Sequence, residues 1–265
     1  MKLHFRASQS PDGQTALEQL THRYGNVPVD DAQAIVALGG DGFMLETMHK
    51  TTDLEVPIYG MNRGTVGFLM NGYEDADLPA RVAAAVQQTI HPLLVSAQDV
   101  NGKVVSANAI NEVSVLRQGP QTANIKISID GKERIDNLMC DGVLLSTPAG
   151  STAYNYSAYG PILPISANVL ALTPIAAFRP RRWRGAVLTQ AAHVHFENID
   201  PYKRPLMVNA DSRAFSNIVS ARVAVNRAVS HRLLFDPGHS LEERILIEQL
   251  FRSPRPIGVA LASRT

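Results

Sequence analysis

Residues 39–42 (Gly-Gly-Asp-Gly) lie between the apolar run Ala34 to Leu38 and a helical pattern that starts near Phe43. Glycines let the backbone turn sharply and approach a ligand closely, and the free N–H groups at a helix start attract phosphate. Asp41 would repel phosphate unless it bound a metal or accepted a proton from an attacking hydroxyl, as phosphoryl transfer requires. The alternative is that Asp41 merely caps the helix, and these four residues alone do not separate the two interpretations.

Three further segments carry groups suited to binding a nucleotide. Residues 60–69 (GMNRGTVGFL) follow the next predicted strand, so we expect them at the same carboxyl edge of a parallel sheet. Asn111 and Glu112 place an amide beside a carboxylate, which suits hydrogen bonds to sugar hydroxyls and a base edge. Residues 141–154 (DGVLLSTPAGSTAY) form a turn rich in small donors that could wrap a nucleotide. Each segment alone also fits an ordinary turn.

Other polar or reactive residues carry weaker signals. His193 and His195 alternate on one predicted strand, but no third metal ligand with suitable spacing is near them. Cys140 has no evident His partner and is interpreted as a small packing residue. A basic cluster contains Arg179, Arg181, Arg182 and Arg184 with Trp183 inside it. It is interpreted as a solvated loop, with contact to phosphates or a neighbouring subunit as the alternative.

Composition limits the classes of function. The 265 residues are 45% hydrophobic and 18% charged, with a net charge of +1, so neither a global basic field for nucleic acid nor an acidic tail is present. A single cysteine fits a reducing compartment. We find neither the apolar stretch of a signal peptide nor a run long enough to span a membrane. The expectation is therefore a cytoplasmic protein that binds neither nucleic acid nor membrane.

The elements that must position these groups follow two patterns. Up to about residue 90, short apolar runs alternate with helical patterns, which predicts βαβ units and a parallel sheet. The Ala-rich stretch 80–88 is predicted to be one more helix. From residue 92 to about 239, strands alternate with turns such as Asn101-Gly102 and Asp130-Gly131, which predict hairpins. Ser240 then opens a capping-box sequence, and an amphipathic helix is predicted after it.

Taken together and in this order, the four segments resemble the NAD kinase family, whose members carry a GGDG loop, an NE pair and a long segment containing GSTAY. The resemblance implies a Rossmann-like α/β domain for ATP binding and catalysis, formed by residues 1–91 and 240–265. It further implies an all-β sandwich domain for NAD binding at 92–239, with the terminal helix returning to the first domain. Oligomers of two or four identical subunits are also implied.

The same resemblance implies roles for individual residues. Asp41 would accept the proton of the 2′-hydroxyl of the adenosine ribose of NAD, and ATP would be the phosphoryl donor. Gly39, Gly40 and Gly42 would hold the ATP phosphates, with a divalent metal, Mg²⁺ by implication, carried on those phosphates near Asp41. The implied NAD-binding residues are Asp41, Gly42, Phe68, Asn111, Glu112, Asp141, Ala149, Thr152, Ala153, Tyr154, Asn155, Tyr156, Ser157 and Ala176.

The sequence departs from the family pattern at two places. Residues 211–213 are Asp-Ser-Arg where Asp-Gly-Gln is expected, and 177–179 are Ala-Phe-Arg where many members have Pro-His-Ser. Two other functions stay open on the residues alone: another GGDG kinase acting on a lipid or a sugar phosphate, and a nucleotide sensor without catalysis. A dehydrogenase ranks lower, because no GxGxxG sequence follows an early strand.

Overall fold

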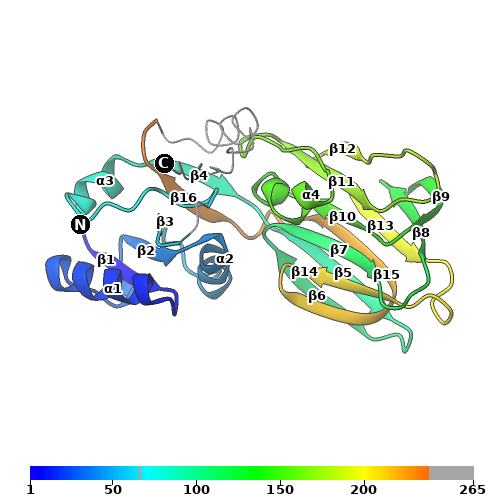
Figure 1. Cartoon of the computed structure of the whole chain (residues 1–265), viewed down its shortest axis with the longest axis horizontal. Helices are drawn as coiled ribbons and strands as arrows, with labels where there is room; N and C mark the ends of the chain where they lie inside the picture. Colours follow the sequence, from blue (N-terminus) through cyan, green and yellow to red (C-terminus); the bar gives the residue numbers. More distant parts are fainter. Residues whose placement is uncertain (65–66, 239–265) are drawn as a thin grey trace, which may run out of the picture.

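The computed structural model describes residues 1–64 and 67–238, which form two lobes side by side (Figure 1). The first lobe contains a sheet of five strands in the order β1-β2-β3-β16-β4. Neighbours among β1, β2, β3 and β16 are parallel, whereas β4 is antiparallel to β16. The strands are β1 (Leu3–Ala7), β2 (Ala34–Gly39), β3 (Ile58–Asn62), β4 (Val86–Ile90) and β16 (His231–Phe235). The expected parallel sheet is therefore present.

Helices α1 (Pro11–Tyr24) and α2 (Asp41–Lys50) contribute to two separate apolar clusters of this lobe. Ala16 and Leu20 of α1 pack in one cluster, and Met44 and Met48 of α2 pack in the other. Every residue of β2 is buried, as expected for a central parallel strand covered on both faces. Strand β2 therefore runs from the buried centre of the sheet through the glycine turn into α2.

The prediction of a helix at 80–88 is wrong for the second half of that stretch. Helix α3 (Leu78–Ala84) ends at Ala84, and 86–90 form strand β4. Pairing with β16 along the sheet edge overrides the local helical preference of this stretch. Strand β16 lies within residues 92–239, which the sequence pattern assigns to the second domain. It instead pairs with β3 in the first sheet.

The second lobe is built from antiparallel strands that form one sheet of eleven. Hairpins are confirmed at Asn101-Gly102 and Asp130-Gly131, where Asp130 and Gly131 both have positive φ, as such tight turns require. The strands are β5 (Leu93–Asp99), β6 (Val104–Ala109), β7 (Glu112–Arg117), β8 (Ala123–Ile129), β9 (Lys132–Cys140), β10 (Gly142–Ser146), β11 (Val169–Ile175), β12 (Ala186–Thr189), β13 (Val194–Asn198), β14 (Leu206–Ala210) and β15 (Arg213–Val225).

The two layers expected of a sandwich are joined into this single sheet by β15. Its first half pairs with β14, and its second half pairs with β13 and β5. Register shifts near residue 218 mark the change of partners, and such irregularities let a strand bend. Side chains from both halves of the sheet share one apolar core.

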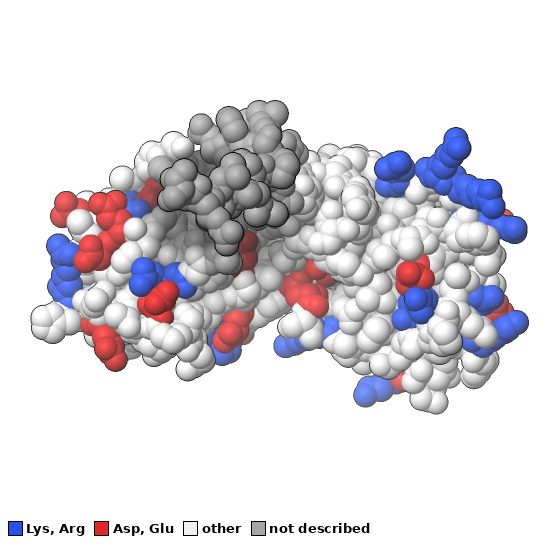
Figure 2. Space-filling model, viewed as in Figure 1, with Lys and Arg blue, Asp and Glu red and all other residues white. Residues whose placement is uncertain are grey.

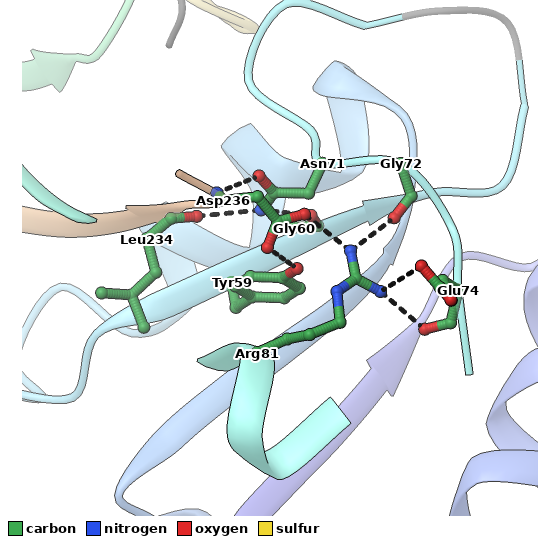
Figure 3. Close-up of polar contacts among 8 residues, drawn as sticks. All are labelled: Tyr59, Gly60, Asn71, Gly72, Glu74, Arg81, Leu234 and Asp236. Atoms are coloured by element: carbon green, nitrogen blue, oxygen red, sulfur yellow. Dashed lines mark hydrogen bonds and ion pairs between the residues drawn. The ribbon is translucent and has the colours of Figure 1, made fainter. Parts of the chain in front are cut away.

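A polar network ties the strand that returns from the second lobe to the first lobe (Figure 3). Asp236 accepts hydrogen bonds from the hydroxyl of Tyr59 at 2.5 Å and from the guanidinium of Arg81 at 2.6 Å. The buried Asn71 donates to the carbonyls of Gly60 and Leu234 and accepts from the N–H of Asp236. Within the described ranges, no helix is long and apolar enough to cross a membrane. The predicted terminal helix from Ser240 lies outside the described residues.

Candidate active site

Asp41 is the first residue of α2, directly after the glycine turn that ends β2. Its Oδ2 accepts a hydrogen bond from the N–H of Phe68 at 2.7 Å, and its Oδ1 accepts one from the N–H of Leu69 at 2.9 Å. The N-cap residue is Gly40, which makes no side-chain bond to the helix start. The Asp41 carboxylate is therefore oriented by the loop that follows β3, and the cap position has no side chain that would obstruct an anion at the N-terminus of α2.

The loop that follows β3 approaches Asp41 so closely that a side chain would not fit at Gly67. A Cβ atom placed there would lie 2.4 Å from Asp41 Oδ1. The loop is closed at its base, where the N–H of Asn71 donates to the carbonyl of Gly60 and its carbonyl accepts from the N–H of Asn62. Phe68, an expected NAD contact, is half-buried on this loop. Asn71 thus anchors the segment that holds Asp41.

Asn111 and Glu112 lie in the tight connection from β6 into β7, defined here as residues 110–112, whose last residue is the first of β7. The carboxylate of Asp211 accepts backbone hydrogen bonds from Ile110 at 2.7 Å, Asn111 at 2.9 Å and Glu112 at 3.3 Å. His49 Nε2 lies 2.7 Å from the same carboxylate. One buried side chain of the second lobe therefore fixes three successive residues of this connection.

The opposite side of the connection is held by the turn after β10. Thr147 donates its hydroxyl to the carbonyl of Ile110 at 2.7 Å and its N–H to that of Asn111 at 2.9 Å. Gly150 packs so tightly that a Cβ would lie 2.3 Å from the carbonyl oxygen of Asn111. Ala149 is buried in an apolar cluster with Ile110. These contacts hold Asn111 and Glu112 in a defined orientation.

Two buried polar atoms in this connection have no hydrogen-bond partner among the described residues, namely Asn111 Oδ1 and Glu112 Oε2. Burial, together with the nearby charge of Asp211, raises the pKa of Glu112 to about 7, although a hydrogen bond from the N–H of Tyr154 opposes the rise. Buried polar atoms are rarely left unsatisfied unless a ligand or water completes them. The pair is thus suited to accept hydrogen bonds from a bound molecule.

A cavity of about 610 Å³ separates α2 from this connection. Its volume suits a small-molecule ligand. It is lined by Gly42, Leu45, Glu46, His49, Lys50, Asn111, Glu112, Asp211, Ser212 and Arg213. The structure thus brings the glycine turn together with Asn111 and Glu112.

The remaining expected contacts lie around β10 and after it. Asp141, just before β10, forms an ion pair with Arg117 at 2.7 Å, and its N–H donates to the carbonyl of Ile175, next to Ala176. Tyr154, Tyr156 and Ser157 of the short helix α4 (Tyr154–Ser157) are exposed. Thr152 and Ala153, which precede α4, are half-buried.

Asn155 is an exception among these residues, because it is fully buried and its amide is used within the protein. It donates to the carbonyls of Ser151 and Pro161 and accepts from the hydroxyl of Thr173 at 2.7 Å. These bonds give Asn155 a role in shaping the turn. Any direct contact of this residue with NAD remains a prediction.

Several residues considered in the sequence lie away from this cavity. Arg179, Arg181, Arg182 and Arg184 are exposed, and Figure 2 shows basic side chains gathered at the end of the second lobe near β9 and β12. Cys140 is buried, which raises the pKa of its thiol to about 12 and agrees with a packing role. Among the residues that the structure describes, no group of three His, Cys, Asp or Glu side chains is arranged to hold a metal, so His193 and His195 lack further ligands.

His49 is not among the residues expected from the sequence, and residues 211–213 are expected there only to depart from the family pattern. Asp211 has a left-handed backbone, with φ of 50°, and its side chain is 6% exposed. Aspartate tolerates this conformation better than most residues. The signal that could have pointed to Asp211 is the family expectation of Asp at this position, whereas no local pattern marks His49.

Comparison with known proteins gives a consistent family. Residues 2–90 match the model of the ATP-NAD kinase N-terminal domain, and residues 110–225 match that of the C-terminal domain. NAD kinase from Cereibacter sphaeroides is 58% identical over 94% of this chain and 98% of its own length. NAD kinase from Caulobacter vibrioides is 55% identical over 94% of this chain and 95% of its own length.

Solved structures share the fold. A crystal structure of yeast NADH kinase complexed with NADH has a TM-score of 0.77 at 18% identity, covering 100% of this chain and 89% of that one. An NAD kinase from Archaeoglobus fulgidus in complex with ATP has a TM-score of 0.74 at 21% identity, covering 94% of this chain and 100% of that one. With both family domains matched in order and relatives above 50% identity over nearly the whole chain, the protein belongs to the ATP-NAD kinase family.

Proposed function

We propose that Asp41 accepts the proton of the 2′-hydroxyl of the adenosine ribose of NAD while that oxygen attacks the γ-phosphate of ATP, giving NADP. The NAD kinase activity follows from the family. The observation that carries the role of Asp41 is its position. It stands at the start of α2 beside Gly42, which lines the cavity, and two backbone N–H groups fix its carboxylate.

The donors to Asp41 leave its carboxylate able to react. From the described residues, each oxygen accepts one backbone hydrogen bond, and these two bonds leave each oxygen a lone pair for the hydroxyl proton. General-base catalysis of this kind contributes about 10² to 10⁴ in rate. The loop bonds add orientation, because a carboxylate held by two N–H groups cannot rotate away from an attacking hydroxyl.

For NAD, Asn111 Oδ1 and Glu112 Oε2, which find no partner in the described part of the chain, provide acceptors for ribose hydroxyls and a base amino group. Asp141 lies at the far end of the paired strands, since Ser146 stands opposite Glu112 and Gly142 opposite Leu116. At about 3.4 Å per residue, the four residues from Glu112 to Leu116 span on the order of 14 Å, and Asp141 lies one residue beyond Gly142. Such a span fits an extended dinucleotide, and we propose that its second half lies toward Asp141, Tyr154 and Ala176.

For ATP, the glycine turn at residues 39–42 and the start of α2 provide backbone N–H groups for the phosphates. We propose that Mg²⁺ arrives on these phosphates beside Asp41, where it would neutralise charge during transfer. Gly39 packs so closely on Phe43 that a Cβ would lie 2.8 Å from it, so the turn needs glycine there.

The reaction is tested by incubating the purified protein with NAD, Mg²⁺ and either ATP or polyphosphate. A strictly NADP-dependent dehydrogenase then reports the product. NADP formation with ATP is expected, whereas tight binding of both nucleotides without NADP would support the sensor alternative. A homodimer or homotetramer is proposed from the family, and light scattering coupled to gel filtration measures that state.

A further inference from the structure

His49 connects the two halves of the candidate site. It lies in the last turn of α2, whose first residue is Asp41, and its side chain is 29% exposed. Its Nε2 lies 2.7 Å from Oδ2 of Asp211, a residue 162 positions later in the chain. This is a side-chain contact between the helix that carries Asp41 and the second lobe.

Asp211 has little freedom to take another position. Its carboxylate is 6% exposed and accepts the N–H groups of Ile110, Asn111 and Glu112. Its own N–H donates to the carbonyl of Glu112 at 3.2 Å. A displacement of Asp211 must therefore displace the connection that carries Asn111 and Glu112.

Helix α2 is a rigid spacer between its two ends. His49 lies eight positions after Asp41, which corresponds to about 12 Å of helix. Asp41 stands at the glycine turn that is proposed to hold ATP, while His49 reaches the connection that is proposed to hold NAD. The hydrogen bond between His49 and Asp211 therefore adds a polar link between the two proposed sites to the apolar packing of Ile110 against α2.

We propose that His49 is a positioning residue for phosphoryl transfer. Through Asp211, it sets the position of Asn111 and Glu112 relative to Asp41, and so aligns the ribose hydroxyl with the base and the phosphate. This inference rests on the proposed function. Its physical basis is that a misplacement of about 1 Å in a reacting group can lower the rate about 100-fold.

Three variants of His49 separate alignment from general stability. His49→Leu removes the hydrogen bond. His49→Gln places an amide N–H close to the position of Nε2 and restores a donor to Asp211, whereas the shorter His49→Asn does not reach it. His22→Leu is the matched control, because His22 is exposed in the last turn of α1.

The experiment measures kcat, KM for NAD, KM for ATP and the melting temperature of each protein. We expect His49→Leu and His49→Asn to lose at least about 10-fold in kcat, with KM for ATP within about twofold of wild type. His49→Gln should recover to within about threefold of wild-type kcat, and His22→Leu should equal wild type. The Gln and Asn variants carry the test if His49→Leu fails to fold.

Equal kcat values for His49→Asn and wild type would overturn the proposal. Equal losses in His49→Gln and His49→Asn would also overturn it, because the donor at the Nε2 position would then be irrelevant. A wild-type protein that makes no NADP would refute the proposed function itself, and His49 would then have no transfer reaction to align. Normal wild-type activity with an unaffected His49→Asn isolates the failure to this inference.

Discussion

The carboxylates of Asp41 and Glu112 have opposite surroundings. Asp41 has a backbone N–H donor on each oxygen, whereas Glu112 has a buried oxygen without a partner in the described chain. Burial and the charge of Asp211 raise the pKa of Glu112 to about 7, so its protonation changes near neutral pH. Because an ionised carboxylate accepts hydrogen bonds more strongly than a neutral one, NAD binding should depend on pH through this residue.

The value of kcat/KM for NAD is expected to rise with pH and to level off above about pH 7, as Glu112 loses its proton. Replacement by Gln keeps the shape but removes the titration. Glu112→Gln should therefore lack this rise and show a plateau about 10- to 100-fold lower, the range for a hydrogen bond to a charged group. Initial rates at saturating ATP from pH 5.5 to 8.5 measure both proteins. Parallel profiles would rule out Glu112 as the titrating group.

At the residue scale, the sequence identified the groups that belong to contiguous patterns. The 39–42 turn and the Asn111-Glu112 pair could be found because glycine, acid and amide types are informative at short spacing. His49 and Asp211 could not be paired, because their contact depends on how the two lobes meet. Nor could the burial that raises the pKa of Glu112 be obtained from its neighbours in the chain.

At the scale of elements, the site depends on a loop that is held at its base. The loop between β3 and α3 donates two N–H groups to Asp41 and is closed by Asn71, which also bonds to Leu234 of β16 (Figure 3). The orientation of Asp41 is thus linked to the strand that returns from the second lobe. The sequence predicted strand, loop and helix here, but not β16 in this sheet, since its partner β3 lies far earlier in the chain.

Gly67→Ala is expected to reduce activity strongly while leaving the protein folded. The added Cβ would lie 2.4 Å from Asp41 Oδ1, so either the loop or the carboxylate must move. A loss of about 10- to 100-fold in kcat is expected from such a displacement. Steady-state kinetics and a thermal melt of the purified variant provide the measurement.

The control for this variant is Gly72→Ala in the same segment, where an added Cβ has nothing within 4 Å. It should retain wild-type kcat. If both variants were fully active, the close approach of Gly67 to Asp41 would have no bearing on catalysis. If both lost activity equally, the effect would come from stiffening the segment and not from contact with Asp41.

At the scale of the whole molecule, the lobes are joined by apolar packing as well as by His49. Ile110 and Ala149 of the second lobe lie in one buried cluster with Met44, Leu69 and Phe235 of the first. The change from alternating helices and strands to strands alone could be predicted from pattern. The joining of all eleven strands into a single sheet could not be predicted, because it depends on β15 changing partners along its length.

His231, at the start of β16, makes the stability of this arrangement depend on pH. Burial, with the nearby His49 and His91, lowers the pKa of His231 to about 4, while Asp211 opposes the shift. The unfolded chain therefore binds a proton between about pH 6.5 and 4 that the folded chain does not. The free energy of unfolding should fall as the pH is lowered through that window, by about 3 kcal/mol from this group.

Urea unfolding of wild type and His231→Gln at pH 7, 6, 5 and 4 measures this contribution. The variant is expected to be less stable than wild type at pH 7, since it loses packing, and the difference should shrink toward pH 4. Other groups also titrate in this range, so the comparison uses the difference between the two proteins. A difference that stays constant with pH would show that His231 is not held neutral by the fold.

The role of Asp41 is tested most directly by Asp41→Asn, assayed for NADP formation at saturating NAD, ATP and Mg²⁺ with an NADP-dependent dehydrogenase as reporter. Asparagine is nearly the same size and its amide oxygen can still accept a loop N–H, but it cannot take up the hydroxyl proton. Turnover is predicted to fall by about 10² to 10⁴, with NAD affinity by calorimetry within about threefold of wild type. Turnover above about a tenth of wild type in the folded variant would contradict the assignment of Asp41 as the proton acceptor.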